Sequence, residues 1–189
     1  MKCDVFKTEI NYIKSVEHRK IIENLLNNLP DYFYKIPASS TGKYHPSFSL
    51  GDGGLVRHTK VAVRIAKELL DNNIIGTHSF NDNDKDLIIM ALLLHDGFKS
   101  GKIKEKYTRF DHPILASNYV LENNELKEDE KKLIANMIAS HMGEWNTSDY
   151  SDITLPLPSN KYERFVHMCD YLSAKKFLDV KFEQNEIVE

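Results

Sequence analysis

The chain has 189 residues, a hydrophobic fraction of 41%, a charged fraction of 28% and a formal net charge of −3. This length suits one domain with a sizeable core, and the composition is that of a soluble globular protein. The sequence shows no basic stripe of the kind that binds duplex nucleic acid, and no apolar run long enough to span a membrane.

The chain starts with Met1-Lys2-Cys3-Asp4, a polar sequence without the apolar stretch of a signal peptide. Its two cysteines, Cys3 and Cys169, are too few and too far apart in sequence for a disulfide framework. We therefore expect a protein of the reducing cytoplasm with no membrane partner. The sequence leaves the oligomeric state open.

The first predicted elements are a helix and a long loop, after residues 1–15, which give no clear signal. Ser15 resembles a helix cap, and apolar residues then repeat at helical spacing over 21–29 until Pro30. Residues 31–53 are rich in Pro, Gly and Ser, which predicts a long loop. Long loops inside compact domains are often functional.

Two helices follow, and both carry histidine. The first covers about 54–70 and has His58 on its apolar stripe. The second contains the eight consecutive apolar residues 87–94, with acids before them and His95-Asp96-Gly97 after them. Such an apolar run predicts a helix buried on all sides, and the acids favour its N-terminal end. Gly97 is the residue expected just past the C-terminus.

Three more helices and the loops between them complete the chain: a basic loop at 99–104, a helix opened by Asp111-His112-Pro113, a helix at 127–142, a Pro-rich loop at 154–158 and a helix at about 159–178. Proline is tolerated in the first turn of a helix. We expect the tail beyond Asp179 to be frayed. No linker to a second domain interrupts the pattern, so we predict a single all-α helical bundle over 1–189, with its core at roughly 20–178.

Five of these helices each place a side chain that can bind metal on or beside an apolar face. The side chains are His58, His95 with Asp96, His112, His141 and Asp170. One histidine on such a stripe is more often a core residue than a ligand, but the coincidence over five helices favours a metal site.

The type and number of these side chains narrow the choice of metal. Imidazole and carboxylate ligands without thiolate suit Mn, Fe, Co, Ni, Mg or Zn. Six ligands are too many for one ordinary zinc site, whereas two divalent ions that share the Asp96 carboxylate would use all of them. A buried carboxylate also needs a cation or dense hydrogen bonding, because burying it unpaired costs several kcal/mol.

The ordered pattern H…HD…H…H…D resembles the HD-domain superfamily of metal-dependent phosphohydrolases, over roughly residues 20–178. The resemblance implies an all-helical fold with a two-metal site. It assigns one ion to His58, His95, Asp96 and Asp170, and a second ion, bridged by Asp96, to His112 and His141.

Shorter segments resemble a narrower group, the HD-type 3′-5′ exoribonucleases. These segments are Pro37-Ala38-Ser39-Ser40, the stretch from Gly53 to His58, and Ser140-His141-Met142-Gly143-Glu144. Met142 departs from the S-H-H-G-E sequence of that group. The sequence shows no attached nucleic-acid-binding domain of the kind that those exonucleases carry.

The resemblance implies an enzyme that uses a metal-activated hydroxide to cleave a phosphoester. The implied substrate is small and phosphorylated: a nucleotide, a cyclic nucleotide or a short single-stranded nucleic acid. Asp96 would touch both ions. Lys99, in a segment similar to the HD-x-x-K form, would neutralise a phosphate oxygen, unless it is an ordinary solvated lysine. Lys43, His45 and Arg57 are further candidates for substrate contact, although an ordinary loop role is the better interpretation of each.

Two other functions stay open at this point. HD-fold enzymes similar to inositol oxygenase use the same ligands and lysine position to hold two irons and activate oxygen. A non-catalytic nucleotide-binding module would keep the fold, although it has no need of an intact ligand set. We expect His18, His78 and His167 at the surface or beside the ligands. Trp145 is expected to stack on a base, or to belong to the core or a lid.

Overall fold

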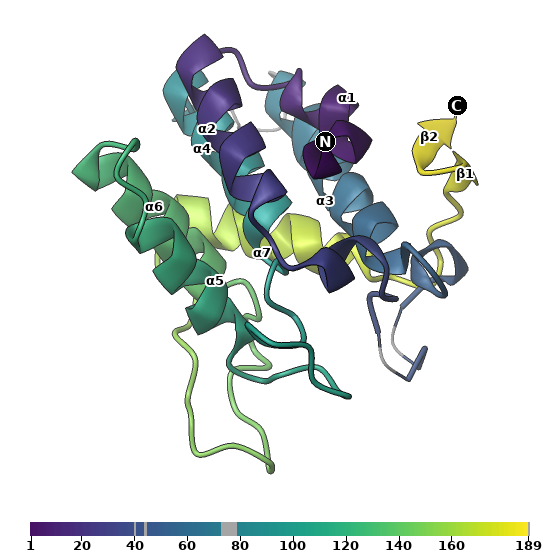
Figure 1. Ribbon diagram of the computed structural model, residues 1–189. Helices are drawn as coiled ribbons and strands as arrows, with labels where there is room; N and C mark the ends of the chain where they lie inside the picture. The colour runs from purple at the N-terminus through teal and green to yellow at the C-terminus, as the bar shows by residue number, and fades with distance from the viewer. Residues whose placement is uncertain (40, 44, 73–78, 189) are drawn as a thin grey trace.

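The computed structural model describes residues 1–39, 41–43, 45–72 and 79–188. These residues form a helical bundle with one small hairpin, so the predicted all-α class is confirmed (Figure 1). The helices are α1 Lys7–Ile10, α2 Val16–Asn27, α3 Gly54–Asp71, α4 Asp82–Leu94, α5 His112–Leu121, α6 Glu128–Ala139 and α7 Lys161–Ser173, with 3-10 turns at Lys2–Phe6, Asp31–Tyr34 and Ser47–Ser49. The hairpin pairs β1 Lys181–Glu183 with β2 Glu186–Val188. Ser40 and His78, named above, lie outside the described residues.

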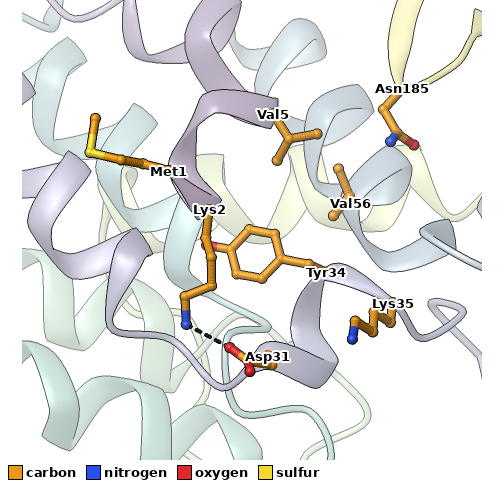
Figure 2. Close-up of a pocket in the computed structure, with 8 residues that line it drawn as sticks. All are labelled: Met1, Lys2, Val5, Asp31, Tyr34, Lys35, Val56 and Asn185. Atoms are coloured by element: carbon orange, nitrogen blue, oxygen red, sulfur yellow. Dashed lines mark hydrogen bonds and ion pairs between the residues drawn. The ribbon is translucent and has the colours of Figure 1, made fainter.

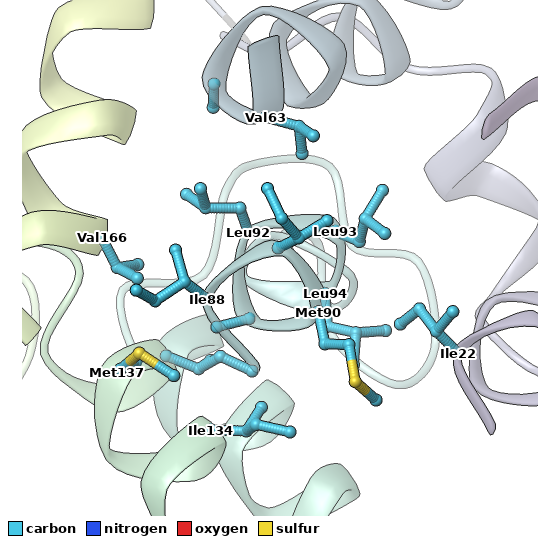
Figure 3. Close-up of a cluster of buried hydrophobic side chains, with 14 of the residues drawn as sticks. Ile22, Val63, Ile88, Met90, Leu92, Leu93, Leu94, Ile134, Met137 and Val166 are labelled. Carbon is cyan, nitrogen blue, oxygen red and sulfur yellow. The ribbon is translucent and has the colours of Figure 1, made fainter. Parts of the chain in front are cut away.

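Helix α4 is the centre of the bundle. Its apolar residues 87–94 are all buried, as the sequence predicts. Figure 3 shows several of them, among them Ile88 and Leu92, packed among residues of four other helices: Ile22 of α2, Val63 of α3, Met137 of α6 and Val166 of α7. Each fully buried aliphatic side chain contributes roughly 1.5–3 kcal/mol. Contacts from four helices therefore fix α4, and they also fix the residues at its C-terminal end.

Polar side chains define where α4 begins. Asn81 accepts a hydrogen bond from the Asp84 N–H at 2.8 Å, and Asp84 accepts one in return from the Asn81 N–H at 3.0 Å. This reciprocal cap satisfies two N–H groups that the helix leaves free. Asp86 is buried and accepts from the N–H groups of Lys14 and Ser15 at 2.7 and 2.8 Å. Ser15 caps α2, so the acidic start of α4 also fixes the start of α2.

Gly97 follows α4 for a different reason from the one predicted. Its backbone is not left-handed, so the turn does not need glycine for its conformation. A Cβ atom at Gly97 would instead lie 2.7 Å from the Leu29 Cδ2 atom and 3.1 Å from the Leu94 carbonyl oxygen. Close packing against the end of α2 is what requires a residue without a side chain here.

The two ends of the chain are attached to α3, and the prediction of a frayed tail beyond Asp179 is wrong. Lys60 of α3 is fully buried, and its Nζ atom lies 2.8 Å from Glu9 Oε2 of α1 and 2.9 Å from Glu186 Oε1 of β2. A buried ammonium group needs such carboxylate partners. The last helix ends at Ser173, earlier than the predicted 178, and the chain then continues to the hairpin.

A hollow of about 440 Å³ lies beside the N-terminal segment (Figure 2), lined by Met1, Lys2, Val5, Asp31, Tyr34, Lys35, Val56 and Asn185. The Lys2 ammonium and the Asp31 carboxylate form an ion pair of 2.9 Å at its edge. None of the six predicted metal ligands lines this hollow, so it is separate from the chemistry below. Among the described residues, no helix combines the length and the apolar character needed to cross a bilayer.

We expect Lys60→Ala to lower the free energy of unfolding by about 3–5 kcal/mol, because Glu9 would remain buried without its partner. Lys132→Ala is the matched control, since Lys132 pairs with Glu128 at the surface of α6 and should lose far less stability. Urea unfolding of both variants measures the difference. Equal losses would show that Lys60 does not hold the chain ends.

Candidate metal centre

The six predicted ligands meet at the C-terminal end of α4. They come from five helices or from the residues directly beside them: His58 from α3, His95 and Asp96 after α4, His112 from α5, His141 after α6 and Asp170 from α7. Their ligand atoms form three overlapping groups, in each of which all atoms lie within 4.8 Å of one another: His58 with His95 and Asp96, His95 with His141 and Asp170, and Asp96 with His112 and His141. The side chains share one small space although they span more than a hundred positions in the sequence.

The Asp96 carboxylate stands between two pairs of imidazoles. Its Oδ1 atom lies 3.0 Å from the His112 Nε2 atom and 3.7 Å from the His141 Nε2 atom. Its Oδ2 atom lies 3.5 Å from the His95 Nε2 atom and 3.7 Å from the His58 Nε2 atom. Because each oxygen faces a different pair, one carboxylate can serve ligand groups on both sides of it.

Three of the four imidazole rings are oriented by a backbone carbonyl that accepts from their Nδ1 atom. The bonds are 2.6 Å from His95 to Leu92, 2.6 Å from His112 to Arg109 and 2.7 Å from His141 to Ile138. A carbonyl oxygen only accepts, so the proton of each neutral ring is on Nδ1. The Nε2 atoms that face the centre are then free to bind metal, which is the usual arrangement around ligating histidines.

Ser173 orients the fourth ring, and the sequence analysis did not identify it. Its hydroxyl donates to the Asp170 carbonyl at 2.7 Å, and its oxygen lies 3.1 Å from the His58 Nδ1 atom. Since the only hydroxyl proton is already used, Ser173 accepts from His58. The His58 Nε2 atom is therefore free as well. A buried serine one helical turn after a ligand is the signal that could have indicated this role.

Buried atoms without partners show that a cation fits the centre. The Nε2 atoms of His58 and His95 and the Oδ1 atom of Asp96 are buried and make no hydrogen bond. The Nε2 atoms of His112 and His141 are 3.3 Å apart. With their protons on Nδ1, neither can donate to the other or to Asp96. Each unsatisfied buried group costs about 1–3 kcal/mol, and a divalent cation would satisfy them together.

The charges at the centre favour the metal-binding forms of several ligands. Burial opposes ionisation of Asp96, but the charges of Lys99 and His95 outweigh it and hold the pKa of the Asp96 carboxyl well below its usual range. The pKa of Asp170 is held low in the same way, by His95 above all. Burial lowers the pKa of His112 to about 4. Burial also acts to lower the pKa of His95, but the two carboxylates outweigh it and raise that pKa.

Two of the predicted substrate-contact residues lie at this centre. The Lys99 Nζ atom is 2.6 Å from the Asp96 Oδ2 atom, and the Lys99 side chain is 12% exposed. The His45 ring centroid is 5.2 Å from that of His58. Burial, followed by the charge of neighbouring groups, lowers the pKa of His45 to about 3, and its Nδ1 atom is buried without a partner. Both side chains therefore lie beside the ligands.

Lys43 and Arg57, the other two candidates for substrate contact, have different surroundings. Lys43 is an exposed residue of the loop before α3. Arg57 donates to the carbonyl oxygens of Phe48 and Leu50 at 2.5 and 2.8 Å, and its third nitrogen lies 3.3 Å from the Asn185 side-chain oxygen. These bonds hold the segment that follows His45, so we assign Arg57 to positioning the loop.

The remaining histidines that the structure describes, His18 and His167, have structural partners. His18 is buried, with Asp86 at 3.3 Å and Glu130 at 3.6 Å, so its predicted place at the surface or beside the ligands is wrong. His167 does lie beside a ligand, because its Nδ1 atom donates to the His141 carbonyl at 2.7 Å. Trp145 is 49% exposed, which excludes a place in the core.

Comparison with models of protein families matches residues 55–175 to the HD domain. This stretch covers more than half of the chain and contains all six ligands and Lys99. Neither the curated proteins nor the solved structures give a match.

We expect Ser173→Ala to weaken binding of Mn²⁺ by about 10–100-fold, because the His58 ring loses the group that fixes its orientation. Ser117→Ala is the matched control: it removes a buried hydroxyl from α5 that bonds to none of the ligands. Calorimetric titration with Mn²⁺, together with a thermal melt, separates weaker binding from lost stability. Unchanged affinity in the folded Ser173→Ala protein would contradict the assignment.

Proposed function

Because the chain belongs to the HD-domain family, we propose that it cleaves a phosphoester of a nucleotide, a cyclic nucleotide or a short single-stranded nucleic acid. Metal-dependent phosphohydrolase activity is general in this family. The observation that carries the proposal is the convergence of four imidazole Nε2 atoms, which carry no proton in the neutral rings, and two carboxylates on one buried space, with a lysine beside them.

We assign the ligands to two divalent ions. His58, His95, Asp96 and Asp170 would hold the first, and His112 and His141 would hold the second, with Asp96 shared. Bound divalent ions lower the pKa of a coordinated water toward neutrality and so supply the nucleophile for hydrolysis. The arrangement of Asp96, with each oxygen facing a different histidine pair, supports this division.

Lys99 is the residue that we expect to bind the phosphate. It neutralises Asp96 in the structure described here, and its long side chain can turn toward a phosphate oxygen when other cations balance that carboxylate. Fixed positive charge placed where the reaction develops negative charge typically contributes about 10²–10³ in rate. The unpartnered Nδ1 atom of His45 is a second group that can bond to the substrate.

Residues 99–109, which include the basic loop 99–104, carry positive charge that supports an anionic substrate. The Arg109 N–H donates to the Lys99 carbonyl at 2.9 Å, so the two ends of the loop are joined beside the metal ligands. Lys102, Lys104 and Lys106 are exposed between these ends. A chain with net charge −3 thus concentrates positive charge next to its candidate centre, which favours anionic substrates such as phosphoesters.

We also propose that residues 1–189 form one HD domain. Lys60 ties α1 and β2 to α3, the helix that carries His58. The segments outside the family match therefore pack against the helices inside it.

A phosphoester panel tests the proposed reaction. Protein purified with and without oxygen is supplied with Mn, Fe, Co, Ni, Mg or Zn and offered nucleoside monophosphates, cyclic nucleotides and short single-stranded oligonucleotides. We expect metal-dependent hydrolysis that Asp96→Ala abolishes and Lys99→Ala slows by about 10²–10³, with Lys132→Ala as the surface control. Oxygen consumption coupled to oxidation of a polyol or phosphonate, with no ester cleaved, would establish the oxygenase instead.

The number of ions is tested by removing one side of the site. His112→Ala and His141→Ala should each lower bound metal from two ions per chain toward one, with a steep loss of activity. The fold should survive, because α5 and α6 keep their apolar contacts. Elemental analysis beside a circular dichroism melt measures both effects. His18→Ala removes a buried histidine outside the centre and should keep the wild-type ratio. A single ion in the wild type, or an unchanged ratio in both ligand variants, rules out the two-ion assignment.

A further inference from the structure

Trp145 follows the ligand His141 after one short turn, and its indole ring is partly exposed. It is the only tryptophan of the chain and is 49% exposed. It belongs to the turns that follow α6, four residues after the ligand His141, and its N–H donates to the Met142 carbonyl at 3.3 Å. Its ring stacks on Tyr171 of α7, with centroids 5.6 Å apart and planes 17° apart. Tyr171 directly follows the ligand Asp170.

In the sequence, the stack is formed beside the most exposed ligand. Asp170 has an 18% exposed side chain, whereas the side chains of the other five ligands are 0–1% exposed. Tyr171 is next to Asp170 in sequence, and His167, one turn earlier on α7, bonds to the carbonyl of His141 at 2.7 Å. The segments that carry Trp145 and Tyr171 are thus fixed to each other at the exposed ligand.

A positively charged side chain lies over one ring of the aromatic pair. The Lys175 Nζ atom lies 3.3 Å from the centroid of the Tyr171 ring. A cation over an aromatic face is attracted by the ring quadrupole and stabilises the position of the tyrosine. Tyr150, on the same long loop as Trp145, is 98% exposed and has no ring contact among the described residues. Of these two exposed aromatic side chains on the loop, only Trp145 is held in place by another ring among the described residues.

We propose that the Trp145–Tyr171 stack binds the aromatic base of the substrate. The centre would then select phosphoesters that carry a nucleobase over those that carry only a sugar. The proposal rests on the proposed function, because the phosphate is what the metal centre and Lys99 would hold. Stacking uses the face that every base offers, so Trp145 would select the class of substrate and not the identity of the base.

Because Trp145 is the only tryptophan, its fluorescence reports directly on this contact. The whole chain with Mg²⁺ is titrated with the four nucleoside 5′-monophosphates and with ribose 5-phosphate. We expect saturable quenching by the nucleotides and none by ribose 5-phosphate. Tyr171→Leu keeps the indole but removes its support, and should raise the nucleotide concentration needed for half quenching. Absence of quenching by all four nucleotides, or equal quenching by ribose 5-phosphate, overturns the proposal.

Kinetics separates a binding role from a structural one. Trp145→Leu should lower kcat/KM for a nucleotide relative to ribose 5-phosphate by about 10–100-fold, and Trp145→Phe, which keeps a ring, should retain most of the preference. Tyr150→Leu, the matched exposed aromatic, should keep the wild-type ratio. An unchanged ratio in Trp145→Leu would refute the stack as a base site. Failure of the proposed function has a different signature: no phosphoester is cleaved while base-dependent quenching persists.

Discussion

The Asp96 carboxylate is buried just after a helix whose residues 86–94 are all buried, and the candidate centre is organised by that constraint. Helix α4 packs against α2, α3, α6 and α7, so its end cannot move toward solvent. A carboxylate in such a place is stable only with positive charge or donors around it. Lys99 supplies one charge. The four imidazoles around Asp96 direct their Nε2 atoms inward, and in the neutral rings these atoms carry no proton. They therefore complete the site only together with a cation.

The positions of the histidines explain how their rings are oriented. His95, His112 and His141 lie at helix ends, and each bonds to the carbonyl three residues before it. His95 and His141 follow the C-terminal ends of α4 and α6, where the last carbonyls lack the usual partner within the helix, so the bond uses such a carbonyl and fixes the ring. His112 opens α5 and bonds instead to a carbonyl of the preceding loop. His58 lies inside α3, where the carbonyls bond to the helix itself. It therefore needs a partner from another element, which is Ser173 of α7.

The contrast between local and distant partners also explains which features the sequence predicted and which it did not. Apolar periodicity predicted the main helices, and the order of the histidines and carboxylates predicted the side chains that meet at the end of α4. The bond from Ser173 to His58, the attachment of the hairpin to α3 and the role of Gly97 depend on residues far away in the chain. Of these, only Ser173 has a local signal, its position one helical turn after Asp170. Residue type alone is ambiguous at Arg57: a guanidinium suits phosphate, but here carbonyls of the loop use its donors, in line with the ordinary loop role.

Arg57 connects the chain end to the candidate centre. The hairpin touches the loop before α3 through Phe182, whose ring centroid is 5.7 Å from that of Phe48, and it touches α3 through Asn185, which lies 3.3 Å from Arg57. That loop carries His45, which lies against His58. Lys60, two residues after His58, fixes the hairpin to the same helix. Helix α3 thus carries a metal ligand and also holds the loop and the hairpin that pack beside it. The C-terminal hairpin therefore helps to position the centre, although it contributes no ligand to it.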